Sequence, residues 1–335
     1  MHARSTLAGT SQHENAAVVI EALNKNFSNV QALQDLNASI HYGRLTGLVG
    51  PDGAGKTTLM RILTGLLEPN TGRATVAGYD VVQDNEAIHV ITGYMPQRFG
   101  LYEDLSVMEN MRLYAQLRGM DADRHTELFA ELLNFTRLGP FTERLAGKLS
   151  GGMKQKLGLA CALMARPKVL LLDEPGVGVD PVSRQDLWRM VQALTDEGMA
   201  VVWSTAYLDE AERCESVLLL NQGQLLFDGP PQTLTAQLEG RSFRLQNVGS
   251  QRRAVLTQAL NLDAVSDGVI QGAGVRIVLR AGAQPESIQT LADQVQVALT
   301  PVPARFEDAF IDLLGGGPGG TSALAERLPV VELGS

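Results

Sequence analysis

The sequence has only two cysteines, Cys161 and Cys214, among its 335 residues. Two cysteines cannot form the set of cross-links that holds small secreted domains together, so a reducing compartment is the default. Its longest clean apolar stretches, such as Val169–Leu172 and Met199–Trp203, are strand-sized. Each is far shorter than the roughly 18 residues that cross a membrane as a helix. We therefore expect any membrane association to come through a partner or through local surface chemistry.

Basic residues are fewer than acidic ones. The chain has 28 lysines and arginines against 37 aspartates and glutamates, a formal net charge of −9. This balance argues weakly against a general nucleic-acid binder, which needs a basic surface for phosphate contacts. Residues Met1–Ala17 are polar and lack the apolar core of a secretory signal, so no such signal is expected there.

Apolar residues are plentiful enough for a sizeable core. They make up 44% of the chain, which excludes a wholly disordered protein. At roughly 150 residues per domain, the length predicts one large domain or two smaller ones. We expect Cys161 to be buried in a helix, whereas the charged stretch around Cys214 leaves room for an exposed thiol.

Short strands and helices alternate through the first 240 residues, which is typical of an α/β domain. The continuous apolar runs Val169–Asp173 and Met199–Ser204 predict buried strands, and the segment from about 99 to 166 is mostly helical. Further expected elements are strands at Ala17–Leu23, Leu36–His41, Arg44–Val49, Gly72–Ala77, Val217–Leu220 and Gln224–Phe227, and a helix at Thr57–Leu66. The sequence thus predicts a polar tail at 1–16 and a larger domain at 17–240.

After Gly240 the order changes to β-α-β-β-α-β, the ferredoxin-like pattern. The expected elements are Ser242–Gln246, Arg252–Leu260, Gly268–Gln271, Val275–Arg280, Pro285–Val295 and Ala298–Val302, followed by an amphipathic helix at Arg305–Leu314. A glycine-rich stretch from 315 to 320 is a linker by composition, and a short apolar piece follows at Leu328–Leu333. We expect a small α+β domain at 241–314 and a linker or tail at 315–335.

The segment Gly50–Thr57, with the sequence GPDGAGKT, fits the pattern G-x-x-x-x-G-K-[ST] between a predicted strand and a predicted helix. Its glycines let backbone N–H groups approach phosphate oxygens, and the helix N-terminus adds a favourable dipole. Lys56 would reach the outer phosphates, and the Thr57 hydroxyl would bind Mg²⁺. We interpret the segment as a phosphate-binding loop rather than an ordinary glycine-rich turn.

The apolar strand at Val169–Leu172 is followed directly by Asp173 and Glu174. The carboxyl ends of such strands form the edge where α/β proteins bind ligands. Asp173 is therefore expected to hold Mg²⁺, and Glu174 to polarise an attacking water as a general base. Without the phosphate loop, the pair would be read equally well as an exposed acidic turn.

A second anion-binding pattern, Leu149–Met153 with the sequence LSGGM, precedes a predicted helix at Lys154–Met164. Ser150, Gly151 and Gly152 offer a hydroxyl, backbone N–H groups and a helix dipole to an anion. One nucleotide rarely needs two such cradles in one chain. We therefore expect the second cradle to complete a nucleotide site on another subunit.

Together these motifs resemble the ATP-binding cassette (ABC) ATPases over roughly Ala17–Gly240. The resemblance implies an α/β P-loop NTPase fold with a mixed core sheet, an antiparallel β lobe and a helical subdomain at about 99–166. It implies that Phe27 stacks on adenine, although a core phenylalanine is the alternative. The implied ATP-binding residues are Phe27, Gly50, Pro51, Asp52, Gly53, Ala54, Gly55, Lys56, Thr57 and Thr58.

The same resemblance implies roles for the remaining motif residues. The implied catalytic residues are Lys56, Gln97 and Glu174. The implied Mg²⁺ ligands are Thr57, Gln97 and Asp173, with Mg²⁺ arriving together with ATP. The residues that match the family signature, which contacts the ATP of a partner domain, are Ser150, Gly151 and Gly152. Asp180 matches the D-loop aspartate, and Gln97 matches the glutamine that links the site to the transmembrane partner.

One departure from the family pattern matters most, although Met153 and the pair Gly176–Val177 also differ from it. The family normally has a histidine after the strand end Trp203–Thr205, where this chain has Ala206. That histidine touches the γ-phosphate, which a methyl group cannot do because it donates no hydrogen bond. Losing one such contact can cost on the order of 10²–10³ in rate. We predict intact ATP binding with weakened hydrolysis, and we expect the neighbouring Tyr207 to be structural.

The finer resemblance is to ATPase subunits of ABC-2 type exporters, above all the first half of YbhF-like tandem-ATPase multidrug exporter proteins. It is carried by Gly50–Met60, Gly93–Glu109, Leu145–Ala160, Pro175–Pro181 and Arg305–Leu314. It implies export of a drug or another substrate through separate ABC-2 permease subunits, with the chain at the cytoplasmic face of the inner or plasma membrane. The partner ATPase domain would follow in the same polypeptide, or the chain would form a homodimer.

Two alternatives come from other functional classes. A soluble ABC ATPase acting on ribosomes or nucleic acid would carry a long charged linker or a basic stripe, which this acidic sequence lacks. A nucleotide-gated module without hydrolysis is supported only by Ala206 and is opposed by Glu174. The exporter interpretation therefore leads, and no nucleic-acid partner is expected.

Overall fold

A computed structural model describes residues 15–97, 100–120 and 126–314. These residues fall into two compact units: 15–206 with 214–228, and 207–213 with 229–314. Most of the expected polar tail at 1–16, and all of the expected linker at 315–335 with its apolar piece Leu328–Leu333, lie outside the described residues. Within the described part, no helix is both long and apolar enough to span a membrane.

The first unit begins with an antiparallel sheet of order β2-β1-β4-β5. Its strands are β1 (Ala16–Phe27), β2 (Val30–His41), β4 (Thr71–Val76) and β5 (Tyr79–Asp80). The strands expected at Ala17–Leu23 and Leu36–His41 are thus the parts of a longer hairpin that lie farthest from its turn at Ser28. Nearer the turn, the alternation of apolar residues breaks because register shifts interrupt the pairing of β1 with β2.

The second sheet has the order β10-β9-β3-β8-β7-β6. Its strands are β3 (Leu45–Val49), β6 (Thr92–Met95), β7 (Val169–Leu172), β8 (Ala200–Thr205), β9 (Ser216–Asn221) and β10 (Gln224–Gly229). In the part of the sheet that runs β9-β3-β8-β7-β6, each strand pairs in parallel with its neighbours. Every residue of β3, β7 and β8 is buried, which explains why their sequences are mainly apolar. Parallel pairing places the carboxyl ends of these strands at one edge of the sheet.

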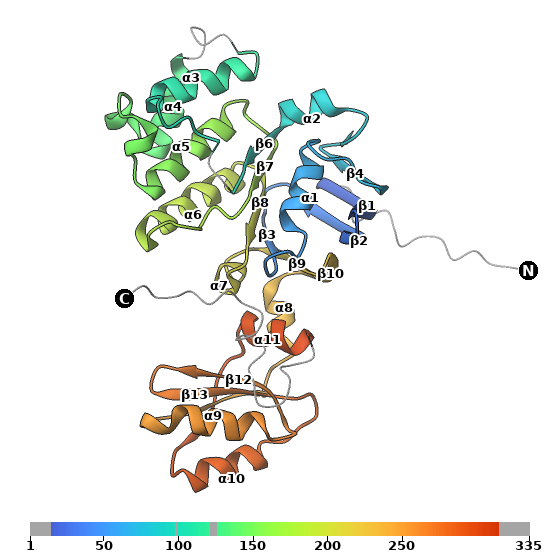
Figure 1. The fold of residues 1–335 in the computed structure, drawn as a ribbon, viewed down its shortest axis with the longest axis vertical. Coiled ribbons are helices and arrows are strands. Elements are labelled where there is room, and N and C mark those ends of the chain that lie inside the picture. The colour runs from blue at the N-terminus through green and yellow to red at the C-terminus, as the bar shows by residue number, and fades with distance from the viewer. Residues whose placement is uncertain (1–14, 98–99, 121–125, 315–335) are drawn as a thin grey trace, which may run out of the picture. The chain divides into compact units, whose positions relative to one another are not determined.

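Helices complete the described part of this unit (Figure 1). They are α1 (Lys56–Leu63), α2 (Asn85–Ile91), α3 (Val107–Leu117), α4 (Thr126–Thr136), α5 (Gly151–Leu163) and α6 (Pro181–Asp196). Asp180 caps α6 by accepting from the Val182 and Ser183 N–H groups, as the Asp-Pro sequence predicts. The antiparallel lobe, the mixed core sheet and the α3–α5 helices confirm the expected P-loop ABC ATPase architecture.

Cys161 and Cys214 are both buried and unlinked. The burial of Cys161 confirms its expected place inside a helix. Cys214 is only 2% exposed, contrary to the suggestion of its charged neighbourhood. Its thiol lies against Gly47 in the middle of β3, where a β-carbon would come within 2.9 Å of the sulfur. The missing side chain at Gly47 therefore makes the room that the thiol fills.

The second unit contains a sheet of order β12-β13-β11-β14. Its elements are β11 (Ser242–Leu245), α9 (Arg252–Leu260), β12 (Val265–Gln271), β13 (Gly274–Leu279), α10 (Glu286–Gln294), β14 (Leu299–Pro301) and α11 (Phe306–Leu313). All the pairings within the sheet are antiparallel, which together with this order confirms the ferredoxin-like fold. Helices α9 and α10 lie on one side of β12 and β13, and α11 lies on the other (Figure 1).

Helix α11 is fastened within the second unit by polar contacts. The buried Arg276 guanidinium donates from Nε to both carboxylate oxygens of Asp308, each at 3.0 Å. The Phe306 N–H donates to Oε1 of Glu212 at 2.7 Å. Glu212 directly follows α7 (Leu208–Ala211), a short helix of this unit, and α11 also packs on α8 (Pro231–Ala236). The C-terminal sheet is thus joined to a segment that lies beside Ala206 in the sequence.

Candidate functional site

The carboxyl edge of the parallel sheet gathers most of the expected site residues. The strands β3, β6, β7 and β8 end there and lead into the phosphate loop, Gln97, the pair Asp173–Glu174 and Ala206, respectively. The order of these strands was not evident from the sequence, and β6 was not expected as a strand. Since β6 has only four residues, it shows no measurable periodicity.

The phosphate loop has the glycines that its path demands. A β-carbon on Gly50 would lie 2.2 Å from the Leu220 carbonyl oxygen, and one on Gly55 would lie 2.5 Å from the Ala32 carbonyl oxygen. Gly55 also has a φ of 106°, which L side chains rarely adopt. The loop backbone therefore packs closely against the segments around Leu220 and Ala32, and only glycine fits at positions 50 and 55.

Lys56 is the first residue of α1 and is only 4% exposed. Its ammonium group donates to the carbonyl oxygens of Gly50 at 2.8 Å and Pro51 at 3.1 Å. It also lies 3.5 Å from Oε1 of Glu174. The buried cation is therefore held by the loop itself and faces the acidic residue expected to activate water.

Asp173 is 1% exposed, and groups from two neighbouring strands hold its carboxylate. The Ser204 hydroxyl donates to Oδ1 at 2.8 Å, and the Tyr94 hydroxyl donates to Oδ2 at 3.4 Å. Burial, followed by the charge of Asp173, raises the pKa of Tyr94 to about 12. Tyr94 therefore keeps its proton at neutral pH and remains a donor. Neither Ser204 nor Tyr94 was expected to have a role at the site.

Glu174 has a φ of 51°, an uncommon conformation for a residue other than glycine. Its carboxylate accepts a hydrogen bond from Nε2 of the exposed Gln97 at 2.5 Å, besides facing Lys56. The structure thus brings together the three expected catalytic residues, Lys56, Gln97 and Glu174. A strained backbone held at a functional edge is a recurrent feature of active sites.

The site suits a phosphate group bound with a hard cation. The Leu59 N–H donates to the Gly55 carbonyl oxygen, which is the first hydrogen bond along α1. The N–H groups of Lys56, Thr57 and Thr58 precede that bond, so they point out of the start of the helix. Carboxylate and hydroxyl oxygens, as in Asp173 and Thr57, are ligands that Mg²⁺ accepts together with phosphate. Among the described residues, no group of three or more His, Cys, Asp or Glu side chains is placed to hold a metal alone. The donor set therefore fits Mg²⁺ shared with phosphate oxygens.

The expected signature residues form a separate cluster with the D-loop. Ser150 caps α5 by accepting from the Met153 N–H at 3.3 Å, so the helix begins at Gly151, before the expected Lys154. A β-carbon on Gly151 would lie 2.7 Å from the Gly178 carbonyl oxygen. One on Gly152 would lie 2.3 Å from the Ser183 side chain. The glycines are thus needed for packing within the chain, apart from any role toward a partner's nucleotide.

Asp180 lies at the exposed start of α6 in this cluster. Hydrogen bonds from Ser183, first its side chain and then its N–H, hold the pKa of Asp180 below its usual range. Phe27, at the end of β1, is 45% exposed, so the alternative of a core phenylalanine is wrong. The Lys25 ammonium lies 5.2 Å from the centroid of the Phe27 ring. An exposed ring of this kind is available for stacking.

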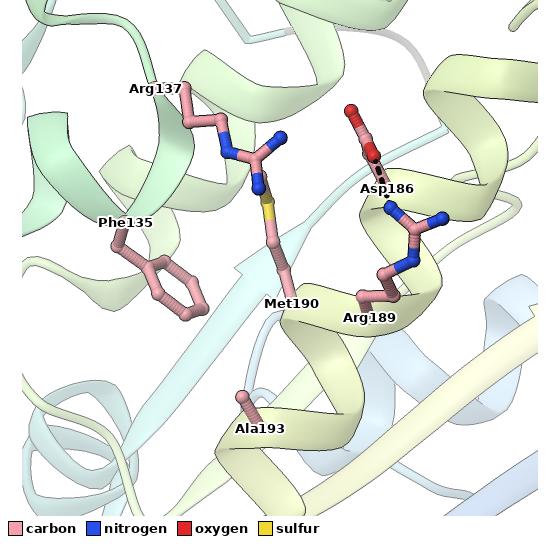
Figure 2. A pocket seen from close by; sticks show the side chains of 6 residues that line it. All are labelled: Phe135, Arg137, Asp186, Arg189, Met190 and Ala193. Atoms are coloured by element: carbon pink, nitrogen blue, oxygen red, sulfur yellow. Dashed lines mark hydrogen bonds and ion pairs between the residues drawn. The ribbon is translucent and has the colours of Figure 1, made fainter.

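A shallow pocket elsewhere in this unit contains none of the expected site residues (Figure 2). Its lining residues lie at or just after the end of α4 and on α6: Phe135, Arg137, Asp186, Arg189, Met190 and Ala193. Asp186 is paired with Arg189 at 2.9 Å and with Lys156 at 3.1 Å. The pocket lacks both a glycine-rich loop and a strand end, so it offers none of the chemistry of the sheet edge.

Comparisons with known proteins agree with this geometry. A family model described as ABC transporter matches residues 33–177. The chain is 54% identical over 319 residues to the probable multidrug ABC transporter ATP-binding protein YbhF of Escherichia coli K12. That match covers 95% of this chain but only 55% of the relative, so the chain spans little more than half of that relative's length.

A second relative is matched over most of its own length. The daunorubicin/doxorubicin resistance ATP-binding protein DrrA of Streptomyces peucetius is 33% identical over 248 residues, which cover 74% of this chain and 75% of the relative. Among solved structures, an ATP-binding subunit of an ABC transporter superposes with a TM-score of 0.60 at 28% identity. It covers 67% of this chain and 93% of the other.

Proposed function

This chain belongs to the ABC transporter ATPases, and from that premise we propose that it drives a multidrug exporter of the ABC-2 type. The observation that carries the proposal is the convergence of Lys56 and Gln97 on Glu174 at the carboxyl edge of the sheet. Relatives named for multidrug transport or drug resistance support the exporter assignment.

The described residues suggest a division of labour in ATP hydrolysis. Lys56 and the N–H groups at the start of α1 would bind phosphate oxygens, and the exposed Phe27 ring would stack on the base. Thr57, Gln97 and Asp173 would hold Mg²⁺, which when bound neutralises charge on the phosphates. Glu174 would accept a proton from the attacking water, and Gln97 would keep the Glu174 carboxylate oriented.

The signature cluster serves a second ATPase domain in this proposal. Ser150, Gly151 and Gly152 would contact the nucleotide of that domain, whose own signature would close over Lys56. Asp180 would lie at the contact between the two domains. The second domain would belong either to the same polypeptide or to a second copy of this chain. Permease subunits of the ABC-2 type would hold the assembly at the cytoplasmic face of the membrane.

Ala206 is a specific weakness of this site. It follows the end of β8, where the family has a histidine that donates to the γ-phosphate. A methyl group supplies no donor, so we propose that the chain binds ATP normally but hydrolyses it slowly. The ferredoxin-like domain at 241–314 would contribute contacts rather than chemistry.

The experiment that tests the proposal measures Mg²⁺-dependent ATP binding and phosphate release by the chain. The Lys56→Ala variant should lose both, whereas Lys168→Ala, which changes an exposed lysine just before the start of β7, should retain phosphate release. Copurification of tagged chain with membrane subunits would support the exporter assignment. Copurification with ribosomes or RNA instead, or undiminished ATP binding in Lys56→Ala, would overturn it.

A further inference from the structure

One buried hydroxyl group joins the two acidic residues of the site. Ser204 lies in β8 and is 0% exposed. Its Oγ is 2.8 Å from Oδ1 of Asp173 and 2.9 Å from the backbone nitrogen of Glu174. The position follows from sheet register, because Leu172 of β7 lies opposite Trp203 of β8. The next residue on each strand is then Asp173 on one and Ser204 on the other.

The direction of the two hydrogen bonds follows from the groups involved. The Glu174 backbone nitrogen can only donate, so the Ser204 oxygen is its acceptor. An ionised Asp173 carboxylate can only accept, so the hydroxyl proton points at Oδ1. A single hydroxyl thus uses both its donor and its acceptor capacity. It fixes the rotamer of Asp173 and, at the same time, the backbone of Glu174.

This contact matters because the backbone conformation of Glu174 and the buried carboxylate of Asp173 are both energetically unfavourable without it. Glu174 has a φ of 51°, which persists only where the surroundings enforce it. The buried Asp173 carboxylate must be oriented if one oxygen is to face a cation. Tyr94 holds the other oxygen from β6, at the longer distance of 3.4 Å. Of the two side-chain contacts to Asp173, the one from Ser204 is therefore the shorter, and Ser204 also contacts Glu174.

We propose that Ser204 is a positioning residue for ATP hydrolysis, acting through Asp173 on Mg²⁺ binding and through Glu174 on the attacking water. The inference depends on the proposed function of the sheet edge as a Mg²⁺–ATP site. It goes beyond that proposal by assigning a role to a residue that touches neither nucleotide nor metal. Partners of this kind typically change metal affinity or activity by about 10- to 100-fold when removed.

The test compares Ser204→Ala, Ser204→Val and Ser204→Thr. Threonine keeps the hydroxyl and valine has the same branched shape without it, so the Thr/Val pair separates hydrogen bonding from packing. Ser242→Ala serves as the matched control, because Ser242 is also buried but its hydroxyl has no hydrogen-bond partner in the described structure. Each variant is assayed for the Mg²⁺ concentration that half-saturates ATP binding, for phosphate release and for thermal unfolding.

We expect Ser204→Ala and Ser204→Val to need about 10-fold more Mg²⁺ and to lose about 10- to 100-fold in turnover. Binding of ATP in EDTA should be unchanged, and Ser204→Thr and Ser242→Ala should behave like wild type. Equal Mg²⁺ dependence in wild type, Ser204→Ala and Ser204→Val would overturn the role of Ser204, as would failure of Ser204→Thr to recover it. Absence of Mg²⁺-dependent ATP binding in the wild-type chain would overturn the proposed function itself.

Discussion

The ammonium group of Lys56 lies 3.5 Å from Oε1 of Glu174. The same ammonium donates to two carbonyl oxygens of its own loop, and Glu174 also accepts from Gln97. The residue expected to bind phosphate and the residue expected to activate water therefore contact each other directly. Phosphate oxygens must compete with Glu174 for the lysine, and this competition can be measured.

The Glu174→Gln substitution keeps the shape of the side chain and removes its charge. We expect turnover to fall by about 10²- to 10⁴-fold, because the general base is lost. ATP affinity should stay equal or rise, since the lysine no longer faces a carboxylate. Single-turnover phosphate release and fluorescent-nucleotide binding check the two effects separately. Glu103→Gln, which removes the exposed partner of Lys154, should change neither.

The Ala206→His substitution restores the family's donor after β8. We expect turnover to rise, with about 10²- to 10³-fold as the upper limit for one electrostatic contact. Steady-state phosphate release measures the gain, and Ala206→Leu controls for side-chain size because leucine donates no hydrogen bond. No gain on restoring histidine would sink the idea that Ala206 weakens this site.

The Gly152→Ala substitution tests the packing of the signature cluster. Its β-carbon would lie 2.3 Å from the Ser183 side chain, so we expect a loss of about 1–3 kcal/mol in the free energy of unfolding. Gly139→Ala is the matched control, because a β-carbon there meets nothing within 4 Å. Adding Ser183→Gly should recover part of the loss. Denaturant unfolding that shows equal stability in Gly152→Ala and Gly139→Ala would contradict the close approach.

The buried pair Arg276–Asp308 should be costly to break on one side. Arg276→Met leaves a buried carboxylate without its cation, and we expect a loss of about 3–5 kcal/mol in the stability of the second unit. The double variant Arg276→Met/Asp308→Leu should be more stable than either single variant, because no unpaired charge remains. Urea unfolding of the whole chain measures the cycle. Additive losses in the double variant would show that the pair is not coupled.

Asp186 provides a test of pH dependence. The hydrogen bond from Lys156, aided by nearby arginines, holds the pKa of Asp186 below its usual range. A lowered folded-state pKa means that the stabilisation is present above the unfolded value of about 3.9 and is lost as pH falls through the folded pKa. Asp186→Asn should therefore cost up to about 1 kcal/mol at pH 7 and progressively less below pH 4.

The pair Asp186–Lys156 also allows a coupling control. Lys156→Met removes the same hydrogen bond, so the double variant with Asp186→Asn should lose less stability than the sum of the single variants. A stability difference between wild type and Asp186→Asn that stays constant from pH 7 to pH 3 would contradict the lowered pKa. Chemical unfolding at fixed salt is the suitable measurement, because salt screens exposed pairs.

Local patterns in the sequence were enough to predict the phosphate loop and its context. The glycine-rich loop, the buried strand before Asp173 and the Asp180-Pro181 cap are short-range signals, and each was found where expected. The β-α-β-β-α-β order likewise predicted the C-terminal fold, because few folds share this order. The loop and the cap depend on interactions between residues close together in the chain, and the C-terminal fold was predicted from the order of its elements alone.

The missed features depend on which strands become neighbours. Ser204 and Tyr94 hold Asp173 only because β8 and β6 flank β7, and nothing local in the sequence indicates that order. Gly47 and Cys214, which lies just before β9, are likewise far apart in sequence but close in space. The hydroxyl residue Ser204, which directly follows the apolar residues Ala200–Trp203 of β8, was the one available signal.

The short segment 207–213 belongs with the C-terminal unit although the ATPase sequence surrounds it. Glu212 of this segment caps α11 by accepting from the Phe306 N–H. A truncation made at the apparent boundary near residue 240 would therefore cut through a structural unit and leave α7 and α8 without the helix that covers them. By the same reasoning, recombination could not exchange the C-terminal unit between relatives at that boundary without also carrying over the segment after Ala206.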